Sequence, residues 1–281
     1  MSDLHLEAQS YADFTVPARA PSLLLCGDVG QLVDYEHYLR FLQSQCRQFS
    51  HVYLTLGNHE FFHATRKESL AKAASLEQEP SLSGKLTVLN RKRVDIPGSD
   101  VALLGCTLHS FVPRESRAIV NAKMLDFRVI GDWSLREHNK EHLQDVEWLR
   151  GQVASIASNE PRRRIMIATH HAPSHINTYN AAHRSSPWGS AFATGLLETE
   201  VKSWPGSKHI AAWVFGHTHW NTDDMHENVR LVSNQRGVVP ARWIPPSFAQ
   251  ARKRYRSKAR SWIARLRGQT SAFDVAKVIS V

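Results

Sequence analysis

Short apolar runs that end in small and polar residues recur along the chain. Four of them are followed directly by Gly, His, Asp or Asn. Such a run is typical of a buried strand, and the small residue after it indicates the turn at the carboxyl end of that strand. The four runs with their polar ends lie at 21–28, 51–60, 165–173 and 213–220.

Helical spacing alternates with these runs. Between Asp34 and Phe49, apolar residues recur at every third or fourth position, and Asp34 is placed to cap the first turn. Strands that alternate with helices predict an α/β layered fold, in which ligands bind at the carboxyl edge of the strands. The same spacing predicts helices over 34–49, 66–78, 142–156 and 192–201, and short apolar runs predict further strands at 86–89, 101–104, 229–234 and 273–281.

The segment from 110 to 139 has no clear periodicity, although it carries Trp133 and several charges. Irregular segments of this length in compact domains are often functional. We therefore expect a long loop that covers a site at the strand ends. Together with the polar loop at 174–190, it would form the pocket for a leaving group.

The composition narrows the class of protein. Of the 281 residues, 42% are apolar and 22% are charged, as in ordinary soluble globular proteins. The three cysteines are odd in number and widely spaced, which fits neither a disulfide framework nor a cysteine-based zinc site and indicates a reducing compartment. No stretch is long enough to span a membrane, and the first residues lack the pattern of a secretory signal. We therefore expect a cytoplasmic protein.

The net charge of +9 belongs to one segment near the end of the chain. From Arg242 to Arg267 there are nine Lys and Arg residues and no Asp or Glu, which leaves 26 basic and 26 acidic residues elsewhere. Apolar residues recur at helical steps over 247–268, so the segment is predicted to form a basic amphipathic helix. Such a helix either packs its apolar face on the domain and exposes its basic face to solvent, or it contacts an anionic membrane or nucleic-acid surface. We therefore divide the chain into a domain at 1–240 and a basic extension at 241–281.

The polar ends of the strands form one chemical set. They offer carboxylate, carboxamide and imidazole groups that would meet at a single sheet edge. Mixed oxygen and nitrogen donors of this kind suit Mn, Fe or Zn better than Ca or Cu(I), and their number is enough for two metal ions. The set comprises Asp3, His5, Asp28, Asn58, His59, His170, His217 and His219.

In this arrangement the sequence resembles the calcineurin-like metallophosphoesterases, whose motifs run Asp-x-His, Gly-Asp, Gly-Asn-His-Asp/Glu, His and Gly-His-x-His. All five motifs occur here in order between Asp3 and His219, over about three-quarters of the chain. The resemblance implies a four-layer α/β fold, a sandwich of two sheets flanked by helices, with a dinuclear metal centre at the strand ends. It implies metal-dependent hydrolysis of a phosphomonoester or phosphodiester. No motif identifies the substrate, so nucleotides and phosphoproteins also stay open.

The resemblance also implies a role for each motif residue. Asp28 would bridge the two metals, because an anionic bridge offsets their repulsion, and a hydroxide shared between them would be the nucleophile. His59 would touch the substrate, as general acid for the leaving oxygen or by steadying the charge of the transition state. One metal would be held by Asp3, His5, Asp28 and His219, and the other by Asp28, Asn58, His170 and His217.

Three further residues are candidates for the substrate side. Glu60 either orients its neighbouring histidine or is solvated. The family motif has one ligand histidine shortly before a proline, whereas here both His170 and His171 precede the proline. The position of that proline favours His170, which leaves His171 to face the substrate or to pack. Among the histidines outside the motifs, His109 follows a strand and is the one that we expect to approach the site.

The first motif departs from the family pattern. That motif ends a buried strand of about five residues, whereas only Met1 and Ser2 precede Asp3 here. We therefore expect a truncated first strand, with Asp3 and His5 on a frayed terminus and the first metal held less tightly than the second. Two alternatives to an enzyme follow. One is a non-catalytic protein that keeps the fold as a binding scaffold, and the other acts on membranes or nucleic acids through the basic helix.

Overall fold

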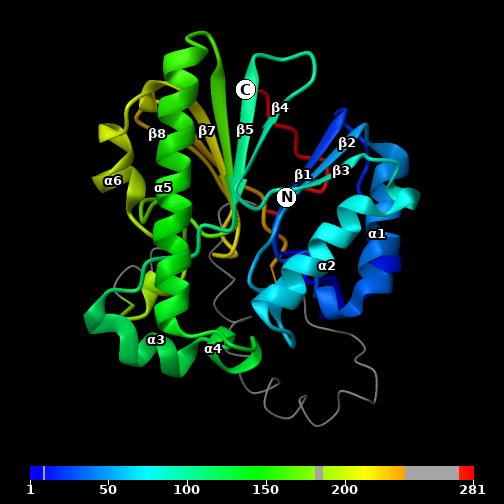
Figure 1. Cartoon of the computed structure of the whole chain (residues 1–281), viewed down its shortest axis with the longest axis horizontal. Coiled ribbons are helices and arrows are strands. Elements are labelled where there is room, and N and C mark those ends of the chain that lie inside the picture. The colour runs from blue at the N-terminus through cyan, green and yellow to red at the C-terminus, as the bar shows by residue number, and fades with distance from the viewer. Residues whose placement is uncertain (9, 181–185, 238–271) are drawn as a thin grey trace.

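The structure, a computed structural model, describes residues 1–8, 10–180, 186–237 and 272–281. These residues form two β-sheets that lie face to face, with helices on both outer sides (Figure 1). This is the predicted four-layer α/β sandwich. No helix among the described residues is long and apolar enough to cross a bilayer. The basic helix at 247–268 and the boundary at 240 lie outside the described residues, so both stay predictions.

The two sheets differ in size and pairing. The first consists of β1 (Ser22–Cys26), β2 (His51–Thr55) and β3 (Leu86–Val88). The second consists of β4 (Lys92–Asp95), β5 (Val101–Cys106), β6 (Arg164–Thr169), β7 (Ile210–Phe215), β8 (Thr222–His226) and β9 (Val229–Ser233). The first sheet is parallel in the order β1-β2-β3, and the second has the order β4-β5-β6-β7-β9-β8 with antiparallel edge strands β4 and β8. The carboxyl ends of the inner parallel strands therefore meet on one side of the sandwich.

Helices cover the outer faces of both sheets. Figure 1 shows α1 and α2 beside the first sheet and α5 and α6 beside the second, with α3 and α4 below the strand ends. Serine and threonine caps start two of the long helices, since Thr65 accepts a hydrogen bond from the backbone of Glu68 and Ser134 from that of Glu137. The helices are α1 (Tyr35–Gln48), α2 (Arg66–Gln78), α3 (Arg117–Lys123), α4 (Asp126–Val129), α5 (Leu135–Asn159) and α6 (Leu196–Thr199).

Three apolar clusters hold the layers together. One lies between the sheets and contains Cys26, Tyr53 and Val214 among its buried residues. A second lies between the first sheet and its helices, and a third lies between the second sheet and α5, where Trp213 is fully buried. The cores on both faces of each sheet explain why the inner strands are near-continuous apolar runs, as the sequence showed.

The amino-terminal residues are fixed between the two sheets, so the expectation of a frayed terminus is wrong. The backbone of Ser2 donates to Asn234 O at 3.0 Å, and that of Asp3 donates to Gly27 O at 3.0 Å. Cys26 in turn donates its N–H to Met1 O at 2.9 Å. Ser2 forms an isolated parallel bridge to Gln235, and no strand precedes β1 in the described residues, so the full first strand of the family pattern is missing, as expected. Because Asp3 and His5 are anchored, the premise for a weaker first metal site fails.

The carboxyl-terminal residues do not form the predicted closing strand. They run as an irregular segment between the sheets (Figure 1). Ile279 packs on the cluster between the sheets, and Phe273 packs on the cluster of the first sheet. Both polar atoms of the Asn234 amide bind the backbone of Asp274, at 2.7 and 3.0 Å. The segment therefore fills the groove beside β1 and β9 without joining either strand.

The region at 110–139 is largely helical, which corrects the prediction of a long loop. It contains α3, α4 and the first turn of α5, and α5 begins at Leu135, seven residues before its predicted start. The helices α3 and α4 are short, with seven and four residues, too few for a clear periodicity in the sequence. The predicted helix at 192–201 is likewise shorter, since only Leu196–Thr199 is α-helical.

Candidate metal centre

The candidate residues lie at the strand ends in a strained backbone. Non-glycine residues enter the left-handed region only at a cost of about 1–2 kcal/mol each. Such strain persists where surrounding structure enforces it, and it concentrates at functional sites. Five of the eight candidates have a positive φ, namely Asp3 at 53°, His5 at 48°, Asp28 at 52°, His217 at 68° and His219 at 51°.

The side chains converge in one pocket. Three groups have ligand atoms that all lie within 4.8 Å of one another, and each could hold a metal ion. Asp28 and His5 each belong to two of the groups, which joins the three into one centre. Asn58 also belongs to this centre, because its Oδ1 lies 3.1 Å from Nε2 of His170. The groups are Asp3, His5 and His219; His5, Asp28 and His59; and Asp28, His170 and His217.

Backbone carbonyls orient two of the histidines. The Nδ1 of His170 lies 2.9 Å from Cys26 O, and the Nε2 of His217 lies 3.2 Å from Ala191 O. Because a carbonyl oxygen only accepts, each of these nitrogens carries a proton, and the other ring nitrogen is the one that would bind a cation. Histidines that bind metals are held in this way in most proteins.

The first group brings two imidazoles and a carboxylate together. The Nε2 atoms of His5 and His219 are 3.0 Å apart, and His219 Nε2 is 3.3 Å from Asp3 Oδ1. Asp3 also accepts the backbone N–H of His217 at 3.0 Å. Burial by itself would raise the pKa of Asp3, but the hydrogen bond and charge of His219 hold it at about 2. The carboxylate is therefore ionised, as a metal ligand must be.

Asp28 lies at the middle of the centre. Its Oδ1 accepts the backbone N–H of His59 at 2.9 Å and lies 3.4 Å from His170 Nε2. Burial opposes ionisation of this carboxyl, but the charges of His170 and His59 hold its pKa well below the usual value. An ionised carboxylate that lies between His5 on one side and His170 and His217 on the other is the arrangement that a bridge between two cations requires.

Glu60 lies beneath the centre rather than on the substrate side. Its carboxylate accepts the backbone N–H groups of Asp28 at 2.9 Å, Val29 at 2.8 Å and Gly57 at 2.7 Å, and the hydroxyl of Tyr38 at 3.0 Å. It therefore ties the loop after β1 to the loop after β2. Its pKa is raised to about 7, first by burial and then by the negative charge of Asp28. Sequence reasoning offered orientation of His59 or solvation, and the buried contacts show neither.

His59 is the candidate with the most exposed side chain, at 16%. Its ring stacks on Phe62 at a centroid distance of 4.2 Å, and its Nδ1 lies 2.7 Å from Glu7 Oε1. The other nitrogen, Nε2, lies 3.9 Å from Asp28 Oδ2 and so faces the centre. Burial would lower the pKa of His59, but Asp28 and then Glu7 raise it to about 10.

Two carboxylates at the centre were missed in the sequence. Glu7 follows His5 by two residues but belongs to no family motif quoted above. Asp126 opens α4 and accepts the Nδ2 hydrogen of Asn58 at 3.0 Å. Its pKa is raised to about 6, chiefly by burial. The only signal for Glu7 was its period-two spacing from Asp3 and His5, and Asp126 had none, because its segment lacked a readable periodicity.

His171 and His109 lie behind the centre. The structure places His170, not His171, beside Asp28 and Asn58. His171 is fully buried and stacks on His217 at 4.0 Å, and His109 follows at 5.4 Å with 1% exposure. Burial holds the pKa of both rings well below the usual value, so they are neutral. They pack against the ligand His217 and against His138 of α5, and a contact with substrate stays a prediction.

A family model described as calcineurin-like phosphoesterase matches residues 1–221, well over half of the chain. The chain belongs to this family. It is 22% identical over 267 residues to an uncharacterised protein of Acanthamoeba polyphaga mimivirus, covering 84% of this chain and 89% of that protein. Its structure is similar to the crystal structure of phosphopantetheinyl hydrolase from Mycobacterium tuberculosis, with a TM-score of 0.61 and 15% identity, covering 88% of this chain and 96% of that chain.

Each comparison supports a different statement. At 15% identity the structural likeness shows the fold alone. Family membership shows that the chain is a metal-dependent phosphoesterase, that is, a hydrolase of phosphoester bonds. The donor set of the structure agrees with this, because buried carboxylates, imidazoles and a carboxamide converge within reach of shared cations.

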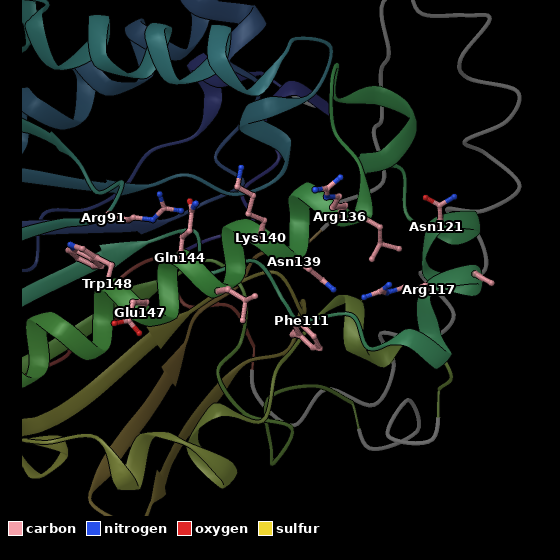
Figure 2. Close-up of a pocket in the computed structure, with 13 residues that line it drawn as sticks. Arg91, Phe111, Arg117, Asn121, Arg136, Asn139, Lys140, Gln144, Glu147 and Trp148 are labelled. Carbon is pink, nitrogen blue, oxygen red and sulfur yellow. The ribbon is translucent and has the colours of Figure 1, made fainter.

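The phosphoesterase also has a cavity of about 1260 Å³ along α5 (Figure 2). Its walls include the apolar side chains of Phe111 and Trp148 and the cations Arg117 and Lys140. None of the candidate metal ligands lines it. On the opposite side of the same helix, His138 contacts the ring of His109 at 4.9 Å. The helix α5 therefore separates this cavity from the centre, and the cavity is not the catalytic pocket.

Replacing Gly57 by Ala is expected to disrupt the centre of the phosphoesterase. A Cβ on Gly57 would overlap Asp28 Oδ1 and lie 2.7 Å from Cε1 of His170, so both side chains would have to move. We expect metal affinity to fall by at least about tenfold in isothermal titration calorimetry. The control is Gly151→Ala in α5, where nothing lies within 4 Å, and which should stabilise the helix by about 0.5–1 kcal/mol. Equal metal affinity of the two variants would contradict the geometry.

Proposed function

We propose that the chain hydrolyses a phosphomonoester or phosphodiester at a dinuclear metal centre built on Asp28. The observation that carries the proposal is that Asp28 converges with His5 on one side and with His170 and His217 on the other, while His5 also converges with Asp3 and His219. The first metal would be held by Asp3, His5, Asp28 and His219, and the second by Asp28, Asn58, His170 and His217. Oxygen and nitrogen donors in these proportions favour Mn, Fe or Zn.

The residues present fit such a pair of cations. Asp3 and Asp28 are buried and ionised, and among the described residues their charge is offset by the neighbouring histidines, with no Lys or Arg in the ligand set. Buried carboxylates need such a positive partner, and a metal cation bound by the neutral imidazoles would supply it. When bound, two divalent cations supply a nucleophilic hydroxide and neutralise charge that develops on the phosphoryl group.

The substrate side of the centre is marked by His59. Its Nε2 faces Asp28 while its Nδ1 is bound by Glu7, so the free edge of the ring is directed at the place where the phosphoryl group would bind. From there the ring can donate a hydrogen bond to the ester oxygen. That contact either delivers a proton to the leaving oxygen or stabilises its negative charge.

A panel of phosphoesters tests the proposal. The chain is treated with a chelator and assayed after addition of Mn²⁺, Fe²⁺ or Zn²⁺, with p-nitrophenyl phosphate, bis(p-nitrophenyl) phosphate and an alkyl phosphate as substrates. We expect no turnover after chelation and recovery with two equivalents of at least one metal. Preference between the first two substrates decides between monoester and diester. If two bound metals restore no hydrolysis, the non-catalytic scaffold takes the place of the enzyme.

The partner and location of the enzyme remain separate proposals. The three cysteines are buried free thiols, in keeping with a reducing compartment such as the cytoplasm. Contact of the basic segment 247–268 with an anionic surface is tested by liposome and DNA binding at two salt concentrations, with and without the residues after 246. Binding that depends on those residues and weakens with salt supports the contact.

A further inference from the structure

Neighbouring residues Asn58 and His59 are each held by a carboxylate from a distant segment, one buried and one largely buried. Asn58 is bound by Asp126 of α4, and His59 is bound by Glu7 of the amino-terminal segment. Asp126 is 2% exposed, and the side chain of Glu7 is 11% exposed. Neither carboxylate belongs to the ligand set, and neither binds an Arg or Lys in the described residues.

The contact with Asp126 selects one of two orientations of the Asn58 amide. The Nδ2 hydrogen is donated to Asp126 Oδ1 at 3.0 Å, while Oδ1 lies 3.1 Å from His170 Nε2. Rotation of the amide by half a turn would set its oxygen against the carboxylate of Asp126 and turn its NH₂ toward the second metal site. An NH₂ group has no lone pair to offer a cation, so the orientation decides whether Asn58 can bind.

The contact with Glu7 selects the orientation of the His59 ring. A carboxylate 2.7 Å from Nδ1 holds the proton on that nitrogen and fixes the ring plane, which Phe62 supports by stacking. Nε2 is then left facing Asp28, 3.9 Å away. Without Glu7 the ring could turn about its χ angles, and either edge could face the substrate.

We propose that Glu7 and Asp126 are positioning residues, one aiming His59 at the ester oxygen and the other aiming the carbonyl of Asn58 at the second metal. The part that concerns Glu7 rests on the proposed function. The part that concerns Asp126 rests only on binding of a cation. Two segments that carry no ligand of the second metal, the residues just after the first motif and α4, thus set the geometry of the Gly-Asn-His motif.

Metal affinity tests Asp126. The variants are Asp126→Ala, which removes the acceptor, and Asp126→Asn, which keeps an oxygen that can accept from Asn58. By calorimetry with Mn²⁺, we expect Asp126→Ala to bind one of two equivalents about 10–100-fold more weakly, and Asp126→Asn to stay close to the wild type. Melting of the metal-free proteins controls for folding. Wild-type affinity in Asp126→Ala, or an equal loss in Asp126→Asn, would overturn the proposal.

Dependence on the leaving group tests Glu7. Glu7→Ala should lower kcat for an alkyl phosphate by about 10²-fold with little change in KM, because an alkoxide needs a correctly aimed donor. It should lower kcat far less for p-nitrophenyl phosphate, whose phenolate leaves without a proton. Glu7→Gln keeps an acceptor for Nδ1 and should recover most of the loss. Equal losses on both substrates, which a purely structural defect would give, or no loss on either, contradict the role of Glu7.

A double variant and a failed assay are both informative. In the background of His59→Asn, removal of Glu7 should cause no further loss, since the ring that it aims is gone. A further loss would show that Glu7 acts elsewhere, for example on His5, whose Nδ1 lies 3.5 Å away.

If the wild-type chain hydrolyses no phosphoester, the proposed function fails and the role of Glu7 fails with it. The calorimetry of Asp126→Ala still decides the role of Asp126.

Discussion

Replacing Asp28 by Asn is expected to lower kcat/KM for any phosphoester by at least about 10³-fold while the protein stays folded. The side chain keeps its size, and the Asn carbonyl can still accept the backbone N–H of His59. What is lost is one negative charge at the point shared by the two groups of ligands. Two cations without an anionic bridge repel each other, so one of them should bind at least about 100-fold more weakly. Calorimetry and steady-state kinetics on the same preparation measure both effects.

Asp100→Asn is the matched control for that substitution. Asp100 is exposed and paired with Arg164 at 2.6 Å, at the amino-terminal ends of β5 and β6. That is the opposite edge of the sheet from the metal centre. Exposed ion pairs contribute about 0–1 kcal/mol, so stability and activity should hardly change. A phosphoesterase that retained full activity in Asp28→Asn would show that the cations, or the chemistry, lie elsewhere.

The inner part of the fold was predictable because its strands are buried on both faces. Residues such as Leu25 and Leu54 belong to apolar runs whose polar ends mark the catalytic edge, and the structure places those ends together. The two edge strands of the second sheet were missed for the converse reason. In β4 (Lys92–Asp95) and β8 (Thr222–His226) much of the surface is exposed, and charged side chains dominate the sequence. Charged edge strands discourage pairing with other chains, and they also lack the apolar pattern by which a strand is recognised in the sequence.

The contacts that orient the site could not be predicted from the sequence. The ligand residues could be predicted because their side-chain chemistry and their spacing at strand ends fit a known motif. Asp126 could not, because it lies 68 residues from Asn58 in a segment of short helices. Glu60 was visible in the sequence, but its role was not, since its five partners include four backbone N–H groups, and backbone groups carry no sequence signal. Which amide a carboxylate accepts from depends on tertiary packing, and a single sequence does not contain that information in readable form.

The anchoring of the first motif shows the same limit. From the sequence, two residues before Asp3 were too few for a buried strand. In the structure the segment needs no strand of its own, because Met1 to Asp3 hydrogen-bond to residues beside β1 and β9. The residues at 272–281 pack into the adjoining groove. Hydrogen bonds to Gly27 and to the distant Asn234 replaced the local strand that the family pattern led us to expect.

Glu60→Ala is expected to destabilise the metal-free protein by about 3–5 kcal/mol. The substitution leaves the buried N–H groups of Asp28, Val29 and Gly57 without a hydrogen-bond acceptor, and each unsatisfied group costs about 1–3 kcal/mol. Glu60→Gln should be destabilised too, because its NH₂ would face these donors. Urea unfolding in the presence of a chelator measures the effect without a contribution from metal binding.

A surface glutamate separates this loss from a general effect of charge. Glu36 lies in the first turn of α1 and is exposed, so Glu36→Ala should cost less than about 1 kcal/mol. If Glu60→Ala unfolded at the same urea concentration as Glu36→Ala, the carboxylate would not be the tie between the loops after β1 and β2. If instead the large loss is found, metal affinity should fall with it in the folded fraction. Asp28 and Asn58 sit on those two loops, and the distance between them is then no longer held.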